Sequence, residues 1–486
     1  MPKFIFIVLA HYKFKNKRKI GRSQFEVYLF FYNLTHKIID FYNKGERIMG
    51  KEYLKADEKD YEELVDFINY VFSHSGGKTD FPSLLPKLYK NKDKIKYHHI
   101  IKVDNRIKGV VGAFPLTLSL LDEKVNVIGI GSVSAHPYSK GQGYMKELMN
   151  KAIYEMKNEN VDMSVLNGYR QRYEHFGYEP CGQHINFNIL HVNINYKRDE
   201  LINKGISIHL LDENDPNIVE KAYRLHSKKN VKVERKKEEF LDILKSWNCR
   251  IYSVFKNGEF IGYISSNNGF IEEIVIENNN DLNFVIASYI KTFNHREVNV
   301  RVPIYEREKI SQLLKICENY SITKNNNFRI FNYEKIVRIM LKLKATYSNL
   351  EDGEYNIKII NYGVLKIKVH KNQVEVKKVK EKTYKAKGNL KNSEDKIYEE
   401  KEYFNSSREE TYKHKETLKS SGEEIYKDKE VLNTSEEEFH IEVNELEAME
   451  FLFSPIKSYF NFNKDTPSFL NSWLPLPLYI DNLDCV

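Results

Sequence analysis

Residues 125–148 read VNVIGIGSVSAHPYSKGQGYMKEL, the most informative stretch of the chain. Its first part is rich in β-branched residues, which predicts a strand. Gly141 and Gly143 then lie one residue apart, and a helix-forming run follows at once. A strand, a glycine turn and a helix in this order direct the free N–H groups of the helix start toward an anion. The stretch therefore predicts an anion-binding turn in an α/β fold.

The segments on either side of this turn predict the rest of an α/β (α+β) domain that spans 49–190. Apolar strands before the turn predict an antiparallel meander, and the helix and strand after it predict a βαβ unit. The expected elements are a strand after Met49, a helix over 58–72, a loop over 75–83, strands at 97–103, 106–121 and 125–135, a helix over 142–158, a strand at 161–166 and a short helix within 168–179.

Residues 191–345 predict a second α/β domain of the same style. Paired strands around an Asn-Gly turn are expected within 250–276, and a helix is expected over 226–247. This part of the sequence has no glycine turn before a helix, so we expect it to bind no cofactor of its own.

Residues 346–486 predict a third, smaller α+β domain that begins with a β-hairpin over 355–379. A charged insertion at about 378–436 interrupts it and repeats every fourteen residues. One apolar residue per heptad is too few for a stable coiled coil, so we interpret the repeat as a duplicated segment that is partly helical or disordered. A partner-binding helix is the alternative. The repeat places four tyrosines in register: Tyr384, Tyr398, Tyr412 and Tyr426.

Composition and charge exclude several classes of function. The chain of 486 residues has a net charge of +8, but residues 1–48 alone hold ten basic and three acidic residues. The remainder is close to neutral, so we predict no nucleic-acid partner. No apolar run approaches the roughly 18 residues of a membrane helix, and the four cysteines form no CxxC pair. We therefore predict no membrane partner, no metal site and a cytoplasmic location.

The basic segment 1–48 is itself unusual. Lys44-Gly45-Glu46 can be encoded by a bacterial ribosome-binding sequence, a short distance before Met49. We expect that translation starts at Met49 and that 1–48 is upstream sequence, with a basic membrane- or RNA-binding arm as the alternative.

The glycine turn also carries a family resemblance. The stretch lacks both GxGxxG and GxxxxGK[ST], but SVSAHPYSKGQGYMKELM resembles the acetyl-coenzyme A loop of the GNAT acetyltransferases, [QR]xxGx[GA]. Lys140 takes the basic position and Gly143 the glycine, whereas Met145 replaces the final small residue. With RYEHFGYE (172–179) and the ending LPLYIDNLDCV (476–486), the chain most resembles the Eis (enhanced intracellular survival) branch.

This resemblance implies two tandem GNAT-type domains with mixed sheets, the second degenerate, followed by a sterol-carrier-protein-like domain. It further implies acetyl-CoA as co-substrate, no metal and a homo-oligomer, hexameric in the family. Residues that would line the pantetheine arm are Val133, Ser134 and Ala135. Those that would hold the pyrophosphate are Lys140, Gly141, Gln142, Gly143, Tyr144, Met145 and Lys146, and further coenzyme contacts fall at Gly168 and Tyr169.

The resemblance also implies the catalytic groups. Tyr173 occupies the general-acid position, and the alternative is an ordinary core tyrosine beside Phe176 and Tyr178. The base of the Eis branch is the chain's own terminal carboxylate, here that of Val486; the alternative is a tail packed for stability only. A covalent acetyl-Cys485 lacks a histidine partner and is disfavoured.

We therefore expect an N-acetyltransferase that moves an acetyl group from acetyl-CoA to a primary amine by direct transfer in a ternary complex. The family acts on aminoglycosides and on lysine side chains. The alternatives are a protein or peptide lysine acetyltransferase, and a non-catalytic coenzyme A- or lipid-binding protein.

Overall fold

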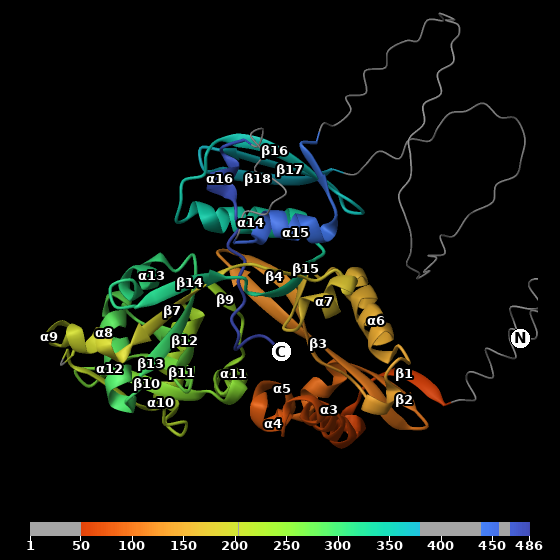
Figure 1. Ribbon diagram of the computed structural model, residues 1–486, viewed down its shortest axis with the longest axis horizontal. Helices are drawn as coiled ribbons and strands as arrows, with labels where there is room; N and C mark the ends of the chain where they lie inside the picture. The colour runs from red at the N-terminus through yellow and green to blue at the C-terminus, as the bar shows by residue number, and fades with distance from the viewer. Residues whose placement is uncertain (1–49, 203, 380–438, 456–466) are drawn as a thin grey trace, which may run out of the picture.

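A computed structural model describes residues 50–202, 204–379, 439–455 and 467–486. These residues form three sheets with helices packed against them, as Figure 1 shows. The predicted α/β (α+β) class with mixed sheets is confirmed. The predicted upstream extension and the charged repeat lie outside the described residues.

The first sheet holds the glycine turn and mixes strands from distant parts of the chain. Its strand order is β1 (Lys51–Lys55), β2 (His98–Val103), β3 (Arg106–Leu120), β4 (Glu123–Ala135), β5 (Met163–Leu166), β15 (Asn326–Ile330) and β6 (Glu179–Cys181), with β9 (Val231–Val233) paired to the end of β3. β4 and β5 are parallel and their neighbours antiparallel, as the predicted meander and βαβ unit require. The helices of this part are α3 (Tyr61–Gly76), α4 (Phe81–Leu84), α5 (Pro86–Tyr89), α6 (Tyr144–Asn158) and α7 (Arg170–Tyr173).

Helices cover both faces of this sheet. α3 packs its apolar side on the face that carries Val110 and Phe114, and α6 packs on the face that carries Val111 and Ile130. Consecutive residues of β3 thus point to opposite layers, as the period of two in a strand demands. The end of β4, where the glycine turn begins, lies between the two helical layers.

The second sheet repeats this plan. Its order is β14 (Asn319–Thr323), β7 (His184–Leu190), β13 (Glu297–Pro303), β12 (Phe270–Ile276), β11 (Glu259–Asn267), β10 (Arg250–Lys256) and β8 (Ile206–Leu210). β12 and β13 form its parallel pair, and the helix between them is α12. The helices are α8 (His191–Tyr196), α9 (Arg198–Leu201), α10 (Pro216–Ser227), α11 (Phe240–Leu244), α12 (Leu282–Phe293) and α13 (Arg307–Leu313).

The two sheets exchange strands. β7 lies at the end of the first predicted domain in sequence but pairs with β13 and β14 of the second sheet. β15 lies near the end of the second predicted domain in sequence but inserts between β5 and β6 of the first sheet. Because β9 also joins the first sheet, the chain crosses four times between the two sheets, and residue 190, where we predict the first domain to end, is the last residue of β7.

The predicted helix over 226–247 is wrong in its middle. Residues 231–233 form β9, and the chain returns to helix with a 3₁₀ turn at Lys237–Glu239 that leads into α11. Val231 and Val233 are buried and Lys232 is half-buried, an alternation that suits an edge strand once the end of β3 offers a partner. The loop expected over 75–83 likewise contains the start of α4. The Asn-Gly turn at 257–258 forms as predicted, with positive φ at both residues.

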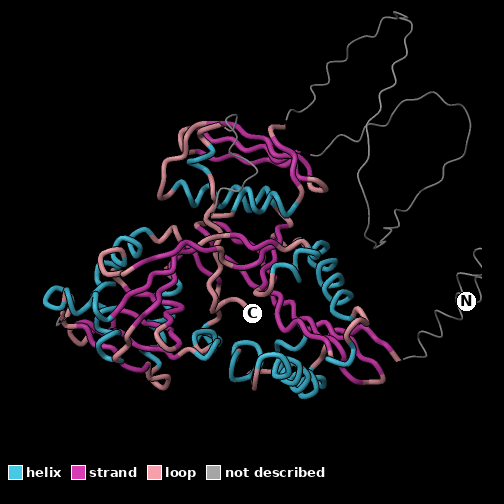
Figure 2. Tube along the Cα trace, viewed as in Figure 1, coloured by secondary structure: helices cyan, strands magenta, loops and turns pink. Residues whose placement is uncertain are grey.

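The third sheet has the order β18 (Gln373–Val379), β17 (Gly363–His370), β16 (Gly353–Ile359) and β19 (Ile441–Val443). The predicted hairpin is thus extended to three antiparallel strands, and β19 joins β16 in parallel. The helices are α14 (Tyr333–Ala345), α15 (Glu445–Phe453) and α16 (Leu470–Trp473). From here the last residues run down as a loop between the first two sheets, where the C-terminus ends (Figure 2).

Candidate active site

The end of β4 is where the site begins, because the sheet opens there. β4 and β5 pair from Val127 to Ile130, and β5 ends at Leu166, opposite Ile130. β4 continues to Ala135, so its last residues lack a strand partner on that side among the described residues. An unpaired strand edge offers N–H and C=O groups to an extended ligand. The residues expected to line the pantetheine arm, Val133, Ser134 and Ala135, lie on this edge.

A bulge bends β4 at the same place. Val110 of β3 pairs with Ser134 and Gly112 pairs with Gly131, so β4 has one residue more than β3 between these pairs. Ser132 takes φ 54°, a conformation that is strained for a residue with a side chain. The Tyr89 hydroxyl bonds the Ser132 Oγ, and the Ser134 hydroxyl donates to the Ser132 carbonyl at 3.0 Å. These two contacts fix the bulge.

The glycine turn connects β4 to α6. A 3₁₀ turn at Pro137–Ser139 is followed by Gly141 at φ 84° and Gly143 at φ 76°. A Cβ at either glycine would meet no atom within 4 Å, so the left-handed backbone, not a lack of room, favours glycine here. Gly143 is the N-cap of α6, and no side chain caps the helix. Its first N–H groups, including those of Tyr144 and Met145, therefore point to the turn.

The residues expected to hold a pyrophosphate gather at this turn. Lys140 and Gln142 flank Gly141 and are exposed, and Lys146 lies in the first turn of α6. In the second sheet the equivalent loop between β12 and α12 has an acidic residue at the helix start: the N-cap of α12 is Asp281, which pairs with Lys256 at 2.7 Å.

The loop after β5 carries the expected acid. Tyr173 ends the short helix α7 and is 5% exposed, and its ring lies against Gly168, where a Cβ would overlap it. Burial raises the pKa of Tyr173, with the charge of Arg172 acting against it, so the hydroxyl stays protonated at neutral pH. Asn327 of the exchanged strand β15 donates to the Gly168 carbonyl at 2.8 Å and holds this loop.

Tyr169 lies in the same loop, but its side chain is exposed to solvent, unlike that of Tyr173. It is the N-cap of α7, it is 76% exposed, and Arg172 lies over its ring. His136, at the end of β4, accepts a hydrogen bond from the Tyr138 N–H and caps the 3₁₀ turn.

The last residue of the chain lies on β4. Cβ atoms built at Gly129 and Gly131 would approach Val486 to 2.9 and 3.1 Å, and the carboxyl carbon of Val486 is among the atoms met at Gly131. Val486 is 9% exposed and belongs to the apolar cluster of α3, α5 and β3. Alternation along β4 places Gly129 and Gly131 on one face and Ile130 on the other, and Ile130 shares a cluster with Tyr173.

Several residues that the sequence did not single out support this site. Tyr89 holds the bulge. In the last six residues of the chain (481–486, here called the tail), Lys87 donates to backbone carbonyls and Arg235 pairs with Asp484. Their partners lie far away in sequence, so local patterns carried no signal for them. The spacing of Gly129 and Gly131 on one face of a strand was a signal of close backbone approach.

Within the described ranges, no group of three or more His, Cys, Asp or Glu side chains is placed to hold a metal ion. In the same ranges no helix is both long and apolar enough to span a bilayer.

The model of the acetyltransferase (GNAT) domain family matches residues 52–181. No curated protein matches the chain in sequence. Similar solved structures include a GCN5-related N-acetyltransferase from Anabaena variabilis (17% identity, covering 68% of this chain and 85% of that chain, TM-score 0.49). Another is a GCN5-related N-acetyltransferase from Kribbella flavida (11% identity, covering 69% of this chain and 86% of that chain, TM-score 0.48). Eis1 from Mycobacterium abscessus is a third (12% identity, covering 67% of this chain and 84% of that chain, TM-score 0.46).

The family match covers β1 to β6 in sequence, and these elements carry the open edge of β4, the glycine turn and the loop of Tyr173. Residues 52–181 therefore match a GNAT acetyltransferase domain, and this match supports an acetyltransferase enzyme.

Proposed function

We propose that the chain transfers an acetyl group from acetyl-CoA to a primary amine, with aminoglycosides as the first acceptor class to test. The observation that carries this proposal is the position of the chain terminus. The carboxyl carbon of Val486 lies against Gly131, one residue before the bulge at Ser132 and beside the open edge of β4. An acceptor amine and a thioester that meet at this edge have a carboxylate next to them.

The residues present fit acetyl-CoA as a substrate. The open edge of β4 at Val133 and Ala135 offers backbone groups to the amides of the pantetheine arm. The start of α6, capped by Gly143 without a side chain, offers N–H groups and a partial positive charge to the diphosphate, and Lys140 adds a full charge. A Cβ at Gly143 would meet nothing within 4 Å, so the turn has room for a ligand group.

In the proposed mechanism Val486 and Tyr173 each move one proton. The Val486 carboxylate accepts a proton from the acceptor ammonium, which leaves the amine lone pair free to attack the thioester carbonyl. The new C–N bond forms and the C–S bond breaks, while the Tyr173 hydroxyl donates its proton to the departing thiolate. The nitrogen then still carries one proton more than the amide product, and it passes this proton to the Tyr173 oxygen, which regains its hydroxyl. The proton held by Val486 leaves to solvent. Burial keeps Tyr173 protonated for this step. Direct transfer needs no covalent enzyme intermediate, and burial raises the pKa of the Cys485 thiol to about 12, which makes it a poor nucleophile.

We further propose that the whole chain has the organisation of the Eis branch. The second sheet, with its own parallel pair around α12, supports a degenerate second GNAT-like domain over 191–345. The third sheet with α15 and α16 supports a sterol-carrier-like domain over 346–486. A homo-oligomer, hexameric as in that branch, is part of this proposal, and light scattering of the purified chain tests it.

One observation weakens the lipid-binding alternative. The apolar cavity of the third domain, between the sheet and its helices, has a volume of about 10 Å³ among the described residues. That is room for about one water molecule and none for an acyl chain or a sterol. Residues that line it include Leu341, Tyr355, Phe451 and Trp473.

The experiment that tests the proposal measures thiol release from acetyl-CoA with aminoglycosides, polyamines and lysine peptides as separate acceptors. We expect turnover with aminoglycosides, and we expect mass spectrometry of the product to show an acetylated amine. Turnover with lysine peptides alone would select the protein acetyltransferase alternative. Binding of acetyl-CoA without thiol release for any amine would contradict an active transferase.

A further inference from the structure

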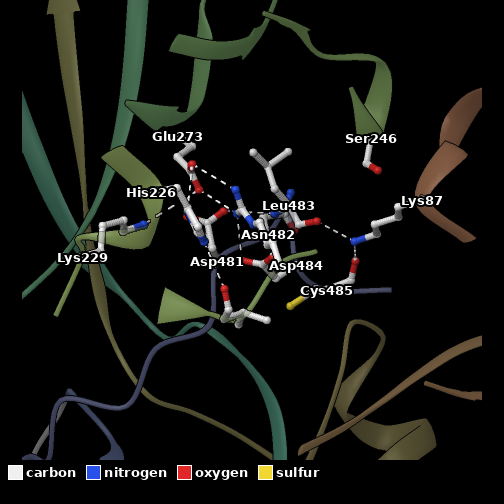
Figure 3. A network of polar contacts seen from close by, with 12 residues as sticks. Lys87, His226, Lys229, Ser246, Glu273, Asp481, Asn482, Leu483, Asp484 and Cys485 are labelled. Carbon is white, nitrogen blue, oxygen red and sulfur yellow. Dashed lines mark hydrogen bonds and ion pairs between the residues drawn. The ribbon is translucent and has the colours of Figure 1, made fainter. Parts of the chain in front are cut away.

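The last residues of the chain are held on both sides where the terminus approaches β4. Arg235, which follows β9, is fully buried between two carboxylates. Its Nε and Nη2 donate to Asp484 at 2.8 and 2.9 Å, and its Nη1 and Nη2 donate to Glu273 of β12 at 3.1 and 2.7 Å. Figure 3 shows Glu273, Asp481 and Asp484 gathered in this network. Asp484, two residues before the terminus, is thereby tied to the second sheet.

The other side of the tail is held by the first domain. The Lys87 Nζ of α5 donates to the carbonyls of Leu483, at 2.5 Å, and of Cys485, and Figure 3 shows both contacts. Lys87 is buried, and burial lowers the pKa of its amine to about 8. Two further donors reach the tail: Trp247 Nε1 to the Asn482 carbonyl at 3.1 Å, and Asn326 Nδ2 to the Cys485 Sγ at 3.3 Å.

We propose that Lys87 and Arg235 are positioning residues that set the Val486 carboxylate for acetyl transfer. This inference rests on the proposed function of Val486 as the base. With Asp484 and the Cys485 carbonyl fixed, little of the chain is left free between the anchors and the terminus. Because the base is already held in place, no conformational entropy has to be lost to position it when the reaction occurs. The second domain, through Arg235 and Glu273, then contributes to a reaction that takes place in the first.

Stability alone is a weak reason for such a network. Desolvation of three charges opposes their mutual attraction, and buried ion triads can often be replaced by apolar side chains without loss of stability. Apolar side chains cannot supply directional hydrogen bonds, and such bonds are needed to fix a tail that is not part of a helix or a strand. Asp484 receives two hydrogen bonds from one guanidinium, a geometry that fixes both distance and orientation.

The test compares two tail variants with two matched controls. Asp484→Asn breaks the ion pair of the tail but leaves Arg235 its other carboxylate, and Lys87→Met removes the donor to the two carbonyls. The controls are Asp281→Asn, which breaks a pair with Lys256 in the second domain, and Lys102→Met, which breaks a pair with Asp60 in the first. None of the control residues contacts the tail in the described part of the chain.

Two kinds of measurement are made on the full chain. The first is the rate at which a carboxypeptidase releases Val486, monitored by mass spectrometry. The second is acetyl transfer, measured as kcat, together with the dissociation constant for acetyl-CoA. For both tail variants we expect the rate of Val486 release to rise by about tenfold or more and kcat to fall by about tenfold or more. The affinity for acetyl-CoA should not change. Lys87→Arg keeps the donors and should restore both. The controls should match the parent chain.

A carboxypeptidase rate equal to that of the parent in both tail variants would overturn the inference, whatever happens to kcat. Faster release with an unchanged kcat would overturn it too, since the anchors would then hold the tail without serving the reaction. A chain extended by Gly-Ser after Val486 tests the proposed function separately. If that extension leaves kcat intact, the base role itself is wrong; if it abolishes kcat, the base role stands whatever the anchor variants do.

Discussion

A Cβ atom at Gly131 would lie 3.1 Å from the carboxyl carbon of Val486, the last residue of the chain. Gly131 precedes the bulge of β4, and Val486 arrives from the third domain, so one missing side chain allows the two to meet. Strand glycines weaken a sheet, and they are retained where a backbone approaches closely. Here the approaching backbone ends in a carboxylate.

Gly131→Ala should therefore displace the terminus. Because the Val486 atoms must move by a few tenths of an ångström or more, we expect kcat to fall by about 10- to 100-fold, the loss that a small misplacement of a reacting group can cause. Binding of acetyl-CoA, measured by calorimetry, should stay the same. The control is Gly76→Ala, where the added Cβ meets nothing within 4 Å, and it should leave kcat unchanged. Full activity of the Gly131 variant would speak against a role for the terminus.

Extension of the chain by two residues after Val486 should abolish most turnover. The terminal carboxylate becomes a peptide bond, which accepts no proton at neutral pH, and the added residues must fit where the described tail is already buried. Steady-state kinetics on the extended chain, with its melting temperature as a check on folding, measure this. An extended chain that keeps the parent kcat would remove Val486 from the mechanism.

Tyr173→Phe should lower kcat by about 10²-fold or more, the contribution of a general acid, with little change in KM. The control is Tyr178→Phe, which removes a buried hydroxyl bonded to Ser164 at 2.8 Å. That control should lose stability but keep the parent kcat after correction for folded protein. Since burial raises the pKa of Tyr173 above its ordinary value near 10, the kcat of the parent chain should show no decrease from this group between pH 7 and about 10. An alkaline loss centred near pH 8 that disappears in the Phe variant would contradict this assignment.

Gly143→Ala should weaken acetyl-CoA binding. The backbone at Gly143 has φ 76°, which costs a residue with a side chain on the order of 1 kcal/mol, so the turn should relax and move the N–H groups of α6. We expect a higher dissociation constant for acetyl-CoA and an unchanged kcat at saturation. Gly258→Ala is the matched control, because it has φ 88° and open space around it but lies in a distant hairpin. Equal loss of binding in both variants would assign the effect to stability.

The sequence predicted the parts of this site that are local. The alternation in β2, β3 and β4 and the glycine turn before α6 depend on neighbours a few residues apart, and their predicted bounds agree with the structure within about two residues at most ends. The valines of β9 lie on either side of Lys232 in a strongly charged segment, and they form a strand because the end of β3 offers a partner.

Long-range pairing explains the rest of what the sequence could not predict. The exchange of β7 and β15 was hidden, because a strand's own residues do not say which of two similar sheets it will join. The grip of Arg235 on Asp484 joins residues 249 positions apart and has no local pattern. The alternating glycines of β4, in contrast, could have been read as a site of close approach, although not of what approaches.

The stability of the fold should depend on pH through Asp481. Burial raises the pKa of Asp481 to about 7, and the negative charges of Glu273 and Asp484 act in the same direction, against the positive charges of Lys229 and Arg235. The unfolded chain releases this proton near the ordinary value of 3.8. Between about pH 4 and 7 the folded state therefore holds a proton that the unfolded state has lost, and the contribution of Asp481 to stability falls as pH rises through this window.

Asp481→Asn removes this titration and keeps the oxygen that accepts the Leu483 N–H at 3.0 Å. The free energy of unfolding of the variant relative to the parent, from urea denaturation, should thus rise between pH 4 and 7 and level off above. Asp352→Asn is a control of opposite sign. Hydrogen bonding by the Lys371 N–H lowers the pKa of Asp352, so its contribution is present at neutral pH and is lost as pH falls below about 4. A relative stability of the Asp481 variant that stays flat from pH 4 to 7 would show that this carboxyl is ionised in the fold, and the tail network would then carry one negative charge more at neutral pH.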